Sequence, residues 1–188
     1  MSVPRSVKVC QAIRSAAMVI NLKDFIKDVP DFPKPGILFK DVTPLLWSGP
    51  AFAAAIEELD RMTQAVDYEV IIGIESRGFI FGAALAQRRQ CGFVPIRKPN
   101  KLPRATFKQT YALEYGEDSL EMHQDALAGH KALIVDDVLA TGGTAEAAAR
   151  LVDKSHGDLA GFAFLIELDF LKGRPRLSPH PVASLLHF

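Results

Sequence analysis

Residues 132–144 read ALIVDDVLATGGT, a stretch that passes from an apolar run through two adjacent carboxylates into a loop of small residues. The apolar residues at 132–135 predict a buried strand, because such runs occur where a strand is covered on both faces. The alanine-rich sequence from Thr144 onward predicts a helix. A buried strand, a short loop and a helix form the basic unit of an α/β fold, so this stretch decides the fold class.

The loop of this unit predicts a phosphate site. It consists of Ala140, Thr141, Gly142, Gly143 and Thr144. Small residues let backbone N–H groups converge, and the following helix adds the positive end of its dipole. The glycines lack Cβ atoms that would block a close approach, and the threonine hydroxyls can donate to phosphate oxygens. The sequence contains neither GxxxxGK[ST] nor GxGxxG, which disfavours a nucleoside triphosphate loop and a dinucleotide loop.

Asp136 and Asp137, which precede this loop, predict that the ligand also carries a sugar diol. Ionised carboxylates only accept hydrogen bonds, and the two vicinal hydroxyls of a ribose can donate them. Together with the loop, the carboxylates indicate a ribose 5-phosphate. The alternative from these residues alone is a helix cap followed by a flexible turn.

Apolar runs and helical patterns alternate along the rest of the chain. Helices are predicted over 51–65 and 78–89, and strands over 70–74, 92–96 and 161–168. This alternation predicts a parallel twisted sheet flanked by helices, with ligand sites at the carboxyl ends of the strands. We expect a single domain over 24–188 after an N-terminal extension over 1–23, for which an organelle transit peptide is the alternative.

Residues 97–123 break this alternation. Basic, aromatic and turn residues are mixed there without a steady helical period. A long irregular segment inside a compact domain is typical of a flexible lid over a binding site. The alternative is an antiparallel hairpin that covers an edge of the sheet.

Composition limits the partners. Lys plus Arg and Asp plus Glu both total 22, so no excess of charge favours nucleic acid or an anionic membrane. The longest apolar runs are much shorter than the roughly 20 residues of a membrane-spanning helix. Cys10 and Cys91 match no metal-binding spacing and form no disulfide framework, which favours the cytoplasm.

Several segments together resemble a known family. VDDVLATGGT, over 135–144, is similar to the phosphoribosyl pyrophosphate motif of type I phosphoribosyltransferases. Four further segments resemble the adenine phosphoribosyltransferase branch: FPKPGILFKD (32–41), ESRGF (75–79), PIRKP with KLP (95–103) and YALEYG (111–116). The resemblance extends from about Phe25 to the C-terminus. It implies the type I fold with a flexible lid and a small N-terminal base-binding segment.

The resemblance also implies an activity. The expected enzyme is a purine salvage transferase that makes AMP and pyrophosphate from adenine and phosphoribosyl pyrophosphate. A homodimer is also implied. So is Mg²⁺ held mainly through the substrate, because Mg²⁺ prefers phosphate and water oxygens. The residues implied to bind pyrophosphate are Glu75, Ser76, Arg77, Arg97, Lys98 and Lys101. The family often has a cis peptide at the position of Glu75–Ser76.

The catalytic and base-binding residues follow from the same resemblance. Glu114, in the LEYG pattern, is the candidate acid/base. A carboxyl group that shares a proton with adenine N7 while N9 attacks the sugar lowers the barrier. The main chains of Leu38 and Lys40 are expected to bind the amino group and N1 of adenine, with Phe39 on the ring. Hypoxanthine and guanine would leave these main-chain groups unpaired.

Two residues depart from the family pattern. Lys40 stands where many relatives have arginine, and Asn100 stands where glycine is common in the lid. A lysine cannot make the bidentate contacts of an arginine, and asparagine has less backbone freedom than glycine.

Other functions stay open at this point. A transferase for another base, such as hypoxanthine or orotate, would differ near Leu38. A ligand-sensing regulator on the same fold would keep residues 136–144 but would need neither Glu114 nor the lid, and the presence of both favours an enzyme. A nucleotide-binding module of unrelated role is the third alternative.

Overall fold

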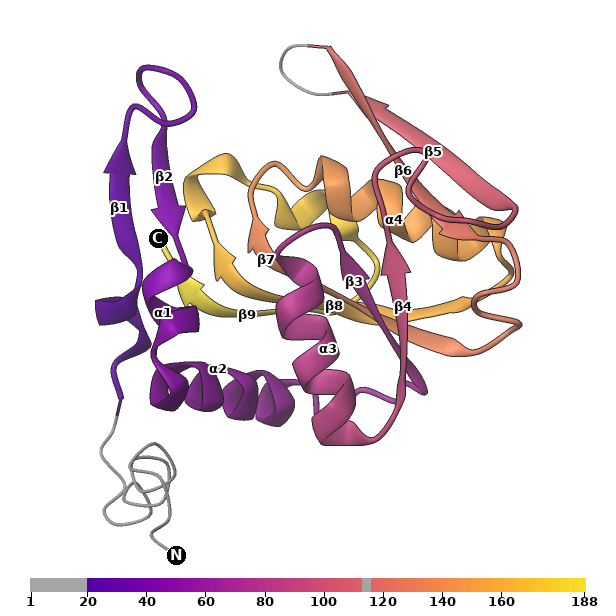
Figure 1. Ribbon diagram of the computed structural model, residues 1–188, viewed down its shortest axis with the longest axis horizontal. Coiled ribbons are helices and arrows are strands. Elements are labelled where there is room, and N and C mark those ends of the chain that lie inside the picture. The colour runs from indigo at the N-terminus through magenta and orange to yellow at the C-terminus, as the bar shows by residue number, and fades with distance from the viewer. Residues whose placement is uncertain (1–19, 113–115) are drawn as a thin grey trace, which may run out of the picture.

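The computed structural model describes residues 20–112 and 116–188, and its centre is a five-stranded sheet (Figure 1). The strands lie in the order β4, β3, β7, β8 and β9, and all neighbouring pairs are parallel. Their bounds are Val70–Ile74 for β3, Gly92–Ile96 for β4, Lys131–Leu139 for β7, Asp158–Glu167 for β8 and Val182–His187 for β9. The predicted α/β class with a parallel sheet is confirmed.

Helices cover both faces of this sheet. The core on one face contains side chains of α2 (Gly49–Met62) and α3 (Gly78–Arg89), and the core on the other contains side chains of α4 (Gly143–Lys154). Within β3, Ile71 packs into the first core and Ile72 into the second. Because successive side chains of a strand point to opposite faces, a strand that serves two cores is apolar throughout.

Local signals explain where the helices begin and end. Ser48 Oγ accepts a hydrogen bond from Ala51 N at 3.3 Å, so α2 begins at Gly49, ahead of the predicted start. α3 ends at Arg89, after which Gln90 has a left-handed φ of 55°. In the part of the chain that the structure describes, every helix is too short or too polar to cross a membrane.

Strand β7 is longer than predicted. The strand expected at 132–135 continues through Leu139 and pairs with β8 as far as Glu167. Asp136 and Asp137 therefore lie inside the strand and not after its end. The apolar residues resume directly after the two acids, and β8 continues to pair with Asp136, Val138 and Leu139, so the strand does not end at the acids.

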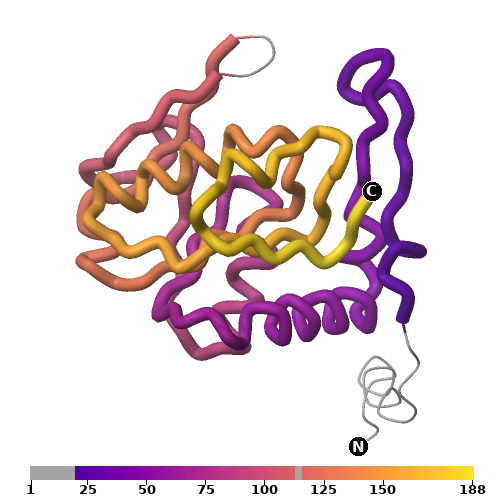
Figure 2. Tube along the Cα trace, turned by 180° about the vertical axis from the view of Figure 1, so that it is seen from behind, coloured from indigo at the N-terminus to yellow at the C-terminus, as the bar shows by residue number. Residues whose placement is uncertain are grey.

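The N-terminal part forms a small layer beside the sheet. It contains the 3-10 turn η2 (Leu22–Phe25), the antiparallel strands β1 (Lys27–Pro30) and β2 (Leu38–Asp41), and the short helix α1 (Thr43–Trp47). Seen from behind, the C-terminal end of the chain lies next to the β1–β2 hairpin (Figure 2). Lys23 Nζ donates to the carbonyl of His187 over 2.9 Å. The sequence predicted neither this hairpin nor β9, since these strands are short and only partly buried.

The region predicted as a lid contains an antiparallel hairpin. Its strands are β5 (Thr106–Ala112) and β6 (Glu117–His123). Leu120 and Met122 of β6 are fully buried against the core of α4, and Arg97 pairs with Glu121 in an isolated bridge. The hairpin was the alternative to an irregular lid, and the flexibility of the segment stays a prediction. Along β5 partly buried and exposed residues alternate, so no apolar run marks the strand.

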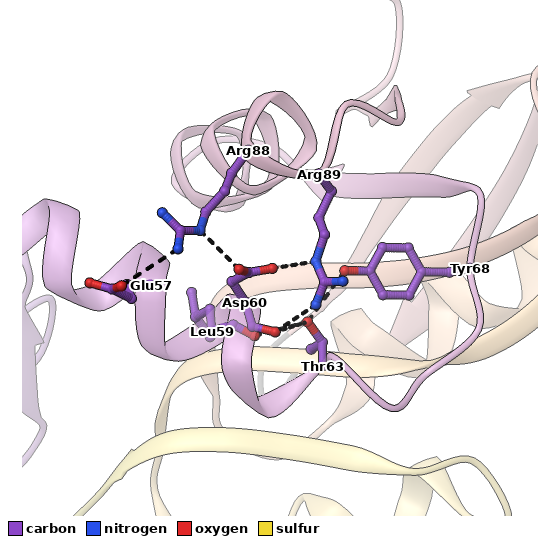
Figure 3. Close-up of polar contacts among 7 residues, drawn as sticks. All are labelled: Glu57, Leu59, Asp60, Thr63, Tyr68, Arg88 and Arg89. Carbon is purple, nitrogen blue, oxygen red and sulfur yellow. Dashed lines mark hydrogen bonds and ion pairs between the residues drawn. The ribbon is translucent and has the colours of Figure 1, made fainter.

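An ionic cluster joins α2 to α3 near the C-terminal ends of both helices (Figure 3). Asp60 of α2 accepts a hydrogen bond from Arg88 Nε at 2.9 Å and forms an ion pair with Arg89. Arg89 also donates to the carbonyl of Asp60 over 2.7 Å and lies over the ring of Tyr68. The side chain of Asp60 is only 23% exposed, so water screens these contacts less than those of a surface pair.

We expect Asp60→Asn to lower the free energy of unfolding by about 2 kcal/mol, because Arg89 loses its carboxylate partner and Arg88 keeps only the 3.6 Å pair with Glu57. Urea denaturation followed by circular dichroism measures the change. Glu58→Gln is the matched control, since Glu58 is 39% exposed and pairs with Arg61 of the same helix. Its effect should stay within about 0.5 kcal/mol. Equal losses in the two variants would contradict a role for the cluster.

Candidate active site

A cavity of about 460 Å³ opens at the carboxyl ends of the strands. It brings together many residues that the sequence predicted: Leu38, Phe39, Lys40, Glu75, Ser76, Arg77, Lys98, Asp136, Asp137, Ala140 and Thr144. The lining residues without a predicted role are Ile37, Tyr111, Val138, Leu168 and Leu171. Leu168 and Leu171 follow β8, and their place after a parallel strand is the signal that could have found them. Glu114 lies outside the described residues.

The two acids of β7 are poorly solvated in this cavity. Asp136 Oδ1 accepts a hydrogen bond from Asp137 N at 2.9 Å, and Asp137 Oδ2 forms a 2.8 Å ion pair with Arg77 Nε. The angle of that pair is not that of a hydrogen bond, so Asp137 Oδ2 is buried without a well-aligned donor in the described part of the chain. Burial, followed by the charge of Asp137, raises the pKa of Asp136 well above its usual range. Burial also raises the pKa of Asp137, and Arg77 opposes that shift. A ligand that donates hydrogen bonds here would stabilise both charges.

The turn between β3 and α3 places a guanidinium next to these acids. α3 begins at Gly78, where an added Cβ would lie 2.6 Å from Asp136 Oδ1. Glycine therefore permits the helix to begin directly against β7. The guanidinium of Arg77 also lies 5.0 Å from the centre of the Phe39 ring, which connects the turn to the N-terminal segment. The Glu75–Ser76 peptide bond is cis, as the resemblance implies.

A smaller cavity of about 70 Å³ lies over the predicted phosphate loop. It is lined by Asp136 and residues 138–145. Gly142 is the N-cap of α4, so the unpaired N–H groups of the first helical turn lie at this loop. The helix also adds the positive end of its dipole. The loop can therefore hold a single anionic group such as a phosphate.

The glycines of the loop have different roles. Gly142 has a φ of +83°, a region that favours glycine, and a Cβ there would lie 2.7 Å from the carbonyl oxygen of Gly173. A Cβ on Gly173 would lie 2.1 Å from the carbonyl oxygen of Ala140. At Gly143 an added Cβ would make contacts of ordinary length, 3.7 Å or more. The close approach of Gly173, for which the sequence predicted no role, thus shapes the loop.

Cations gather beside the cavity, and each is paired with a carboxylate. Arg97 Nε and Lys101 Nζ lie 3.2 and 3.5 Å from the carboxylate of Glu75, and Lys98 Nζ pairs with Asp118. Burial raises the pKa of Glu75, but hydrogen bonds from Lys98 N and from Arg97 outweigh this effect and lower the pKa. A carboxylate repels pyrophosphate, so the side chain of Glu75 is suited to holding the cations and not to binding the anion.

The apolar part of the cavity lies between the N-terminal segment and the residues after β8. Leu38 and Phe39 line it from the first, and Leu168 and Leu171 from the second. The ring of Phe32 contacts Phe39 edge-on, with 5.1 Å between the ring centres, which supports its orientation. Two apolar walls of this kind can hold a flat ring between them.

The chain matches known proteins over most of its length. Residues 48–180 match the family model described as the phosphoribosyl transferase domain. An adenine phosphoribosyltransferase from Gloeobacter violaceus is 54% identical over 168 residues, which cover 89% of this chain and 98% of the relative. The chain belongs to the adenine phosphoribosyltransferase family.

Solved structures of adenine phosphoribosyltransferases have the same fold. That of Thermoanaerobacter pseudethanolicus has a TM-score of 0.87 at 49% identity, covering 89% of this chain and 98% of its own. That of Saccharomyces cerevisiae, complexed with D-2,5-dideoxy-2,5-imino-altritol 1,6-bisphosphate and adenine, has a TM-score of 0.82 at 44% identity, with coverages of 88% and 96%. The predicted family, the type I fold and the class of pentosyl-transferring enzymes are thereby confirmed.

Two departures from the adenine phosphoribosyltransferase pattern have local reasons. Lys40 Nζ forms a 2.6 Å ion pair with Asp28 and lies 4.2 Å from the centre of the Phe188 ring. Its side chain thus ties β2 to β1 and to the C-terminal residue. Asn100 has a φ of +65°, which asparagine tolerates better than most residues, and its N–H donates to Glu121 Oε2 at 3.1 Å.

We expect Asp136→Asn to stabilise the protein at neutral pH while it weakens AMP binding. A carboxyl group whose pKa is raised on folding destabilises the folded state once the pH exceeds its unfolded-state pKa of about 3.9. The stability gained by the variant should therefore be absent at lower pH and grow as the pH rises from about 4. Urea denaturation at a series of pH values measures this gain, and calorimetry measures AMP binding. A variant less stable than the wild type at neutral pH would contradict the raised pKa of Asp136.

Proposed function

We propose that the protein catalyses the formation of AMP and pyrophosphate from adenine and phosphoribosyl pyrophosphate, a purine salvage reaction. One observation carries the proposal: a phosphate loop, a carboxylate pair, a group of cations and an apolar slot meet at one edge of the sheet. The substrates present the matching groups, which are the 5′-phosphate, the ribose diol, the diphosphate and the flat purine ring.

The sugar phosphate would be held by β7 and the loop after it. Residues 140–144 bind the 5′-phosphate through backbone N–H groups and hydroxyls, and Asp136 and Asp137 accept hydrogen bonds from the ribose. The buried Asp137 Oδ2 without a well-aligned donor supports this role. The yeast relative, complexed with an imino-altritol bisphosphate and adenine, supports a phosphate site and a base site in one enzyme.

Adenine would lie between Phe39 and the leucines after β8. The main chains of Leu38 and Lys40 bind its amino group and N1. The 2.6 Å ion pair of the Lys40 side chain with Asp28 supports this role, because it occupies the ammonium group of a residue that lines the cavity. An unpaired buried polar group costs about 1–3 kcal/mol, and about 1.4 kcal/mol corresponds to a tenfold preference, so hypoxanthine and guanine would be rejected.

The chemical step forms a bond from adenine N9 to the anomeric carbon and breaks the bond from that carbon to pyrophosphate, with inversion. Positive charge develops on the ribose, and the field of Asp136 and Asp137 stabilises it. Arg77, Lys98 and the two cations on Glu75 stabilise the departing pyrophosphate. Glu114 accepts the proton that adenine loses from N7, because N7–H becomes more acidic as N9 bonds to the anomeric carbon.

The lining of the cavity fits Mg²⁺ as the metal. Among the described residues that line it, side chains offer carboxylate and hydroxyl oxygens but no histidine nitrogen or cysteine sulfur. Mg²⁺ would be held mainly by oxygens of phosphoribosyl pyrophosphate, with the carboxylates of Asp136 and Asp137 in the same cavity. When bound, it supplies positive charge that favours departure of pyrophosphate.

The proposal includes that the protein forms a homodimer and lies in the cytoplasm. The side chains of Trp47 and Phe170 are 92% and 66% exposed, and exposed apolar groups of this size support contacts with a second copy. Cys91 is a free thiol, which supports a reducing compartment.

AMP formation tests this function directly. Each purine base and orotate is supplied with phosphoribosyl pyrophosphate and Mg²⁺, and we expect adenine to exceed hypoxanthine, guanine and orotate by about a hundredfold or more in kcat/KM. In the same assay Glu114→Gln should lower turnover with adenine by about a hundredfold, since Gln cannot exchange the N7 proton.

Glu117→Gln is the matched control for that variant, because Glu117 is an exposed acid three residues further along the chain. Its turnover should equal that of the wild type. Preference for another base would overturn the proposed substrate. Full activity of Glu114→Gln together with activity lost in Glu117→Gln would transfer the acid/base role to Glu117.

A further inference from the structure

Four side chains form a continuous series of polar contacts beside the cavity. Lys98 Nζ donates to Asp118 Oδ2, and the hydroxyl of Tyr111 donates to the same oxygen over 3.2 Å. Thr144 Oγ1 in turn donates to the hydroxyl of Tyr111 over 3.4 Å. The second oxygen of Asp118 accepts a hydrogen bond from Ser119 N at 2.7 Å. Asp118 is therefore the acceptor on which the series converges.

The series connects three separate parts of the fold. Lys98 follows β4, Tyr111 and Asp118 are cross-strand partners in the β5–β6 hairpin, and Thr144 lies in the first turn of α4. Thr144 lines both the phosphate cavity and the main cavity, whereas Lys98 lines the main cavity. The contacts thus extend from the proposed 5′-phosphate site to the proposed pyrophosphate cations. Asp118 lines neither cavity, so it lies behind the residues that do.

We propose that Asp118 is a positioning residue for the diphosphate of phosphoribosyl pyrophosphate. It holds the ammonium group of Lys98 at the cavity wall, and through Tyr111 it fixes that group relative to the phosphate loop. The two ends of the substrate are then bound by groups whose separation is already set. This inference rests on the proposed function, because it assumes that Lys98 meets the diphosphate and Thr144 the 5′-phosphate.

A carboxylate near a polyanion site has two opposing effects. Its charge repels the diphosphate, whereas its contact immobilises a lysine side chain, which has one of the largest conformational entropies to lose on binding. The repulsion is weakened because Asp118 is paired with Lys98, is 27% exposed to solvent and lies outside the cavity lining. We therefore expect that positioning outweighs repulsion.

Asp118 also affects the charge of its partner. Burial is the largest single effect on the pKa of Lys98 and lowers it, but the hydrogen bonds and charges of Asp118 and Tyr111 together outweigh burial and raise the pKa. Lys98 therefore stays protonated, as a contact with pyrophosphate requires.

Asp118→Asn tests the inference, because it keeps the shape of the side chain and removes its charge. We expect KM for phosphoribosyl pyrophosphate to rise about tenfold, while kcat and KM for adenine change less than about twofold. Tyr111→Phe should act in the same direction. The double variant should lose less than the product of the two single effects, because both substitutions interrupt one series.

Asp125→Asn is the matched control. Asp125 follows β6 at the base of the same hairpin, pairs with Arg104 and is 67% exposed, away from both cavities. Its KM for phosphoribosyl pyrophosphate should match that of the wild type. An equal rise in Asp125→Asn and Asp118→Asn would show that the hairpin has only a structural role and would overturn the inference.

Calorimetry with phosphoribosyl pyrophosphate and Mg²⁺ separates this inference from the proposed function. Affinity should fall in Asp118→Asn by about the same tenfold factor as KM rises. Unchanged or tighter binding would overturn the positioning role. If Asp118→Asn is unfolded in a thermal scan, Tyr111→Phe alone decides the outcome. A wild type that binds this ligand in an Asp118-dependent way but makes no AMP would refute the proposed reaction and leave the inference intact.

Discussion

Asp136 and Asp137 carry adjacent carboxylates inside the central strand of the sheet, where burial disfavours their charged forms. The surroundings that compensate for them also build the site. Arg77 pairs with Asp137, and Gly78 lets α3 begin against Asp136. The turn between β3 and α3 is thereby placed over β7, next to the phosphate loop. A ribose that donates two hydrogen bonds, and becomes positive in the transition state, would complete the compensation.

The proposed pyrophosphate cations are also paired with opposite charges, because each has a carboxylate partner in the described structure. The pairs are Arg77 with Asp137, Arg97 and Lys101 with Glu75, and Lys98 with Asp118. Such pairs orient long side chains before the ligand arrives, which reduces the entropy lost on binding. At the Arg77–Asp137 pair, binding would exchange one partner for another. As the diphosphate takes Arg77, for instance, Asp137 becomes free to accept a ribose hydroxyl.

The pattern of apolar and polar residues predicted those strands and helices whose successive residues are buried in a regular pattern. Strand β7 is apolar over 132–135 because both faces of the sheet are covered there. Its two acids and the loop after it carry the family resemblance. Pattern failed where a residue's role depends on a distant neighbour. Gly173 matters because it approaches the loop at Ala140, and Asp118 because the register of the hairpin sets it opposite Tyr111. The role of Glu114, outside the described residues, stays a prediction.

A crystal structure of the protein with AMP would show most directly whether β7 and its loop hold a ribose 5-phosphate. We predict that the 5′-phosphate accepts hydrogen bonds from backbone N–H groups of residues 140–144, and that the ribose hydroxyls donate to Asp136 and Asp137. The base should lie against Phe39. A phosphate bound away from the loop, or a ribose that contacts neither carboxylate, would contradict this assignment.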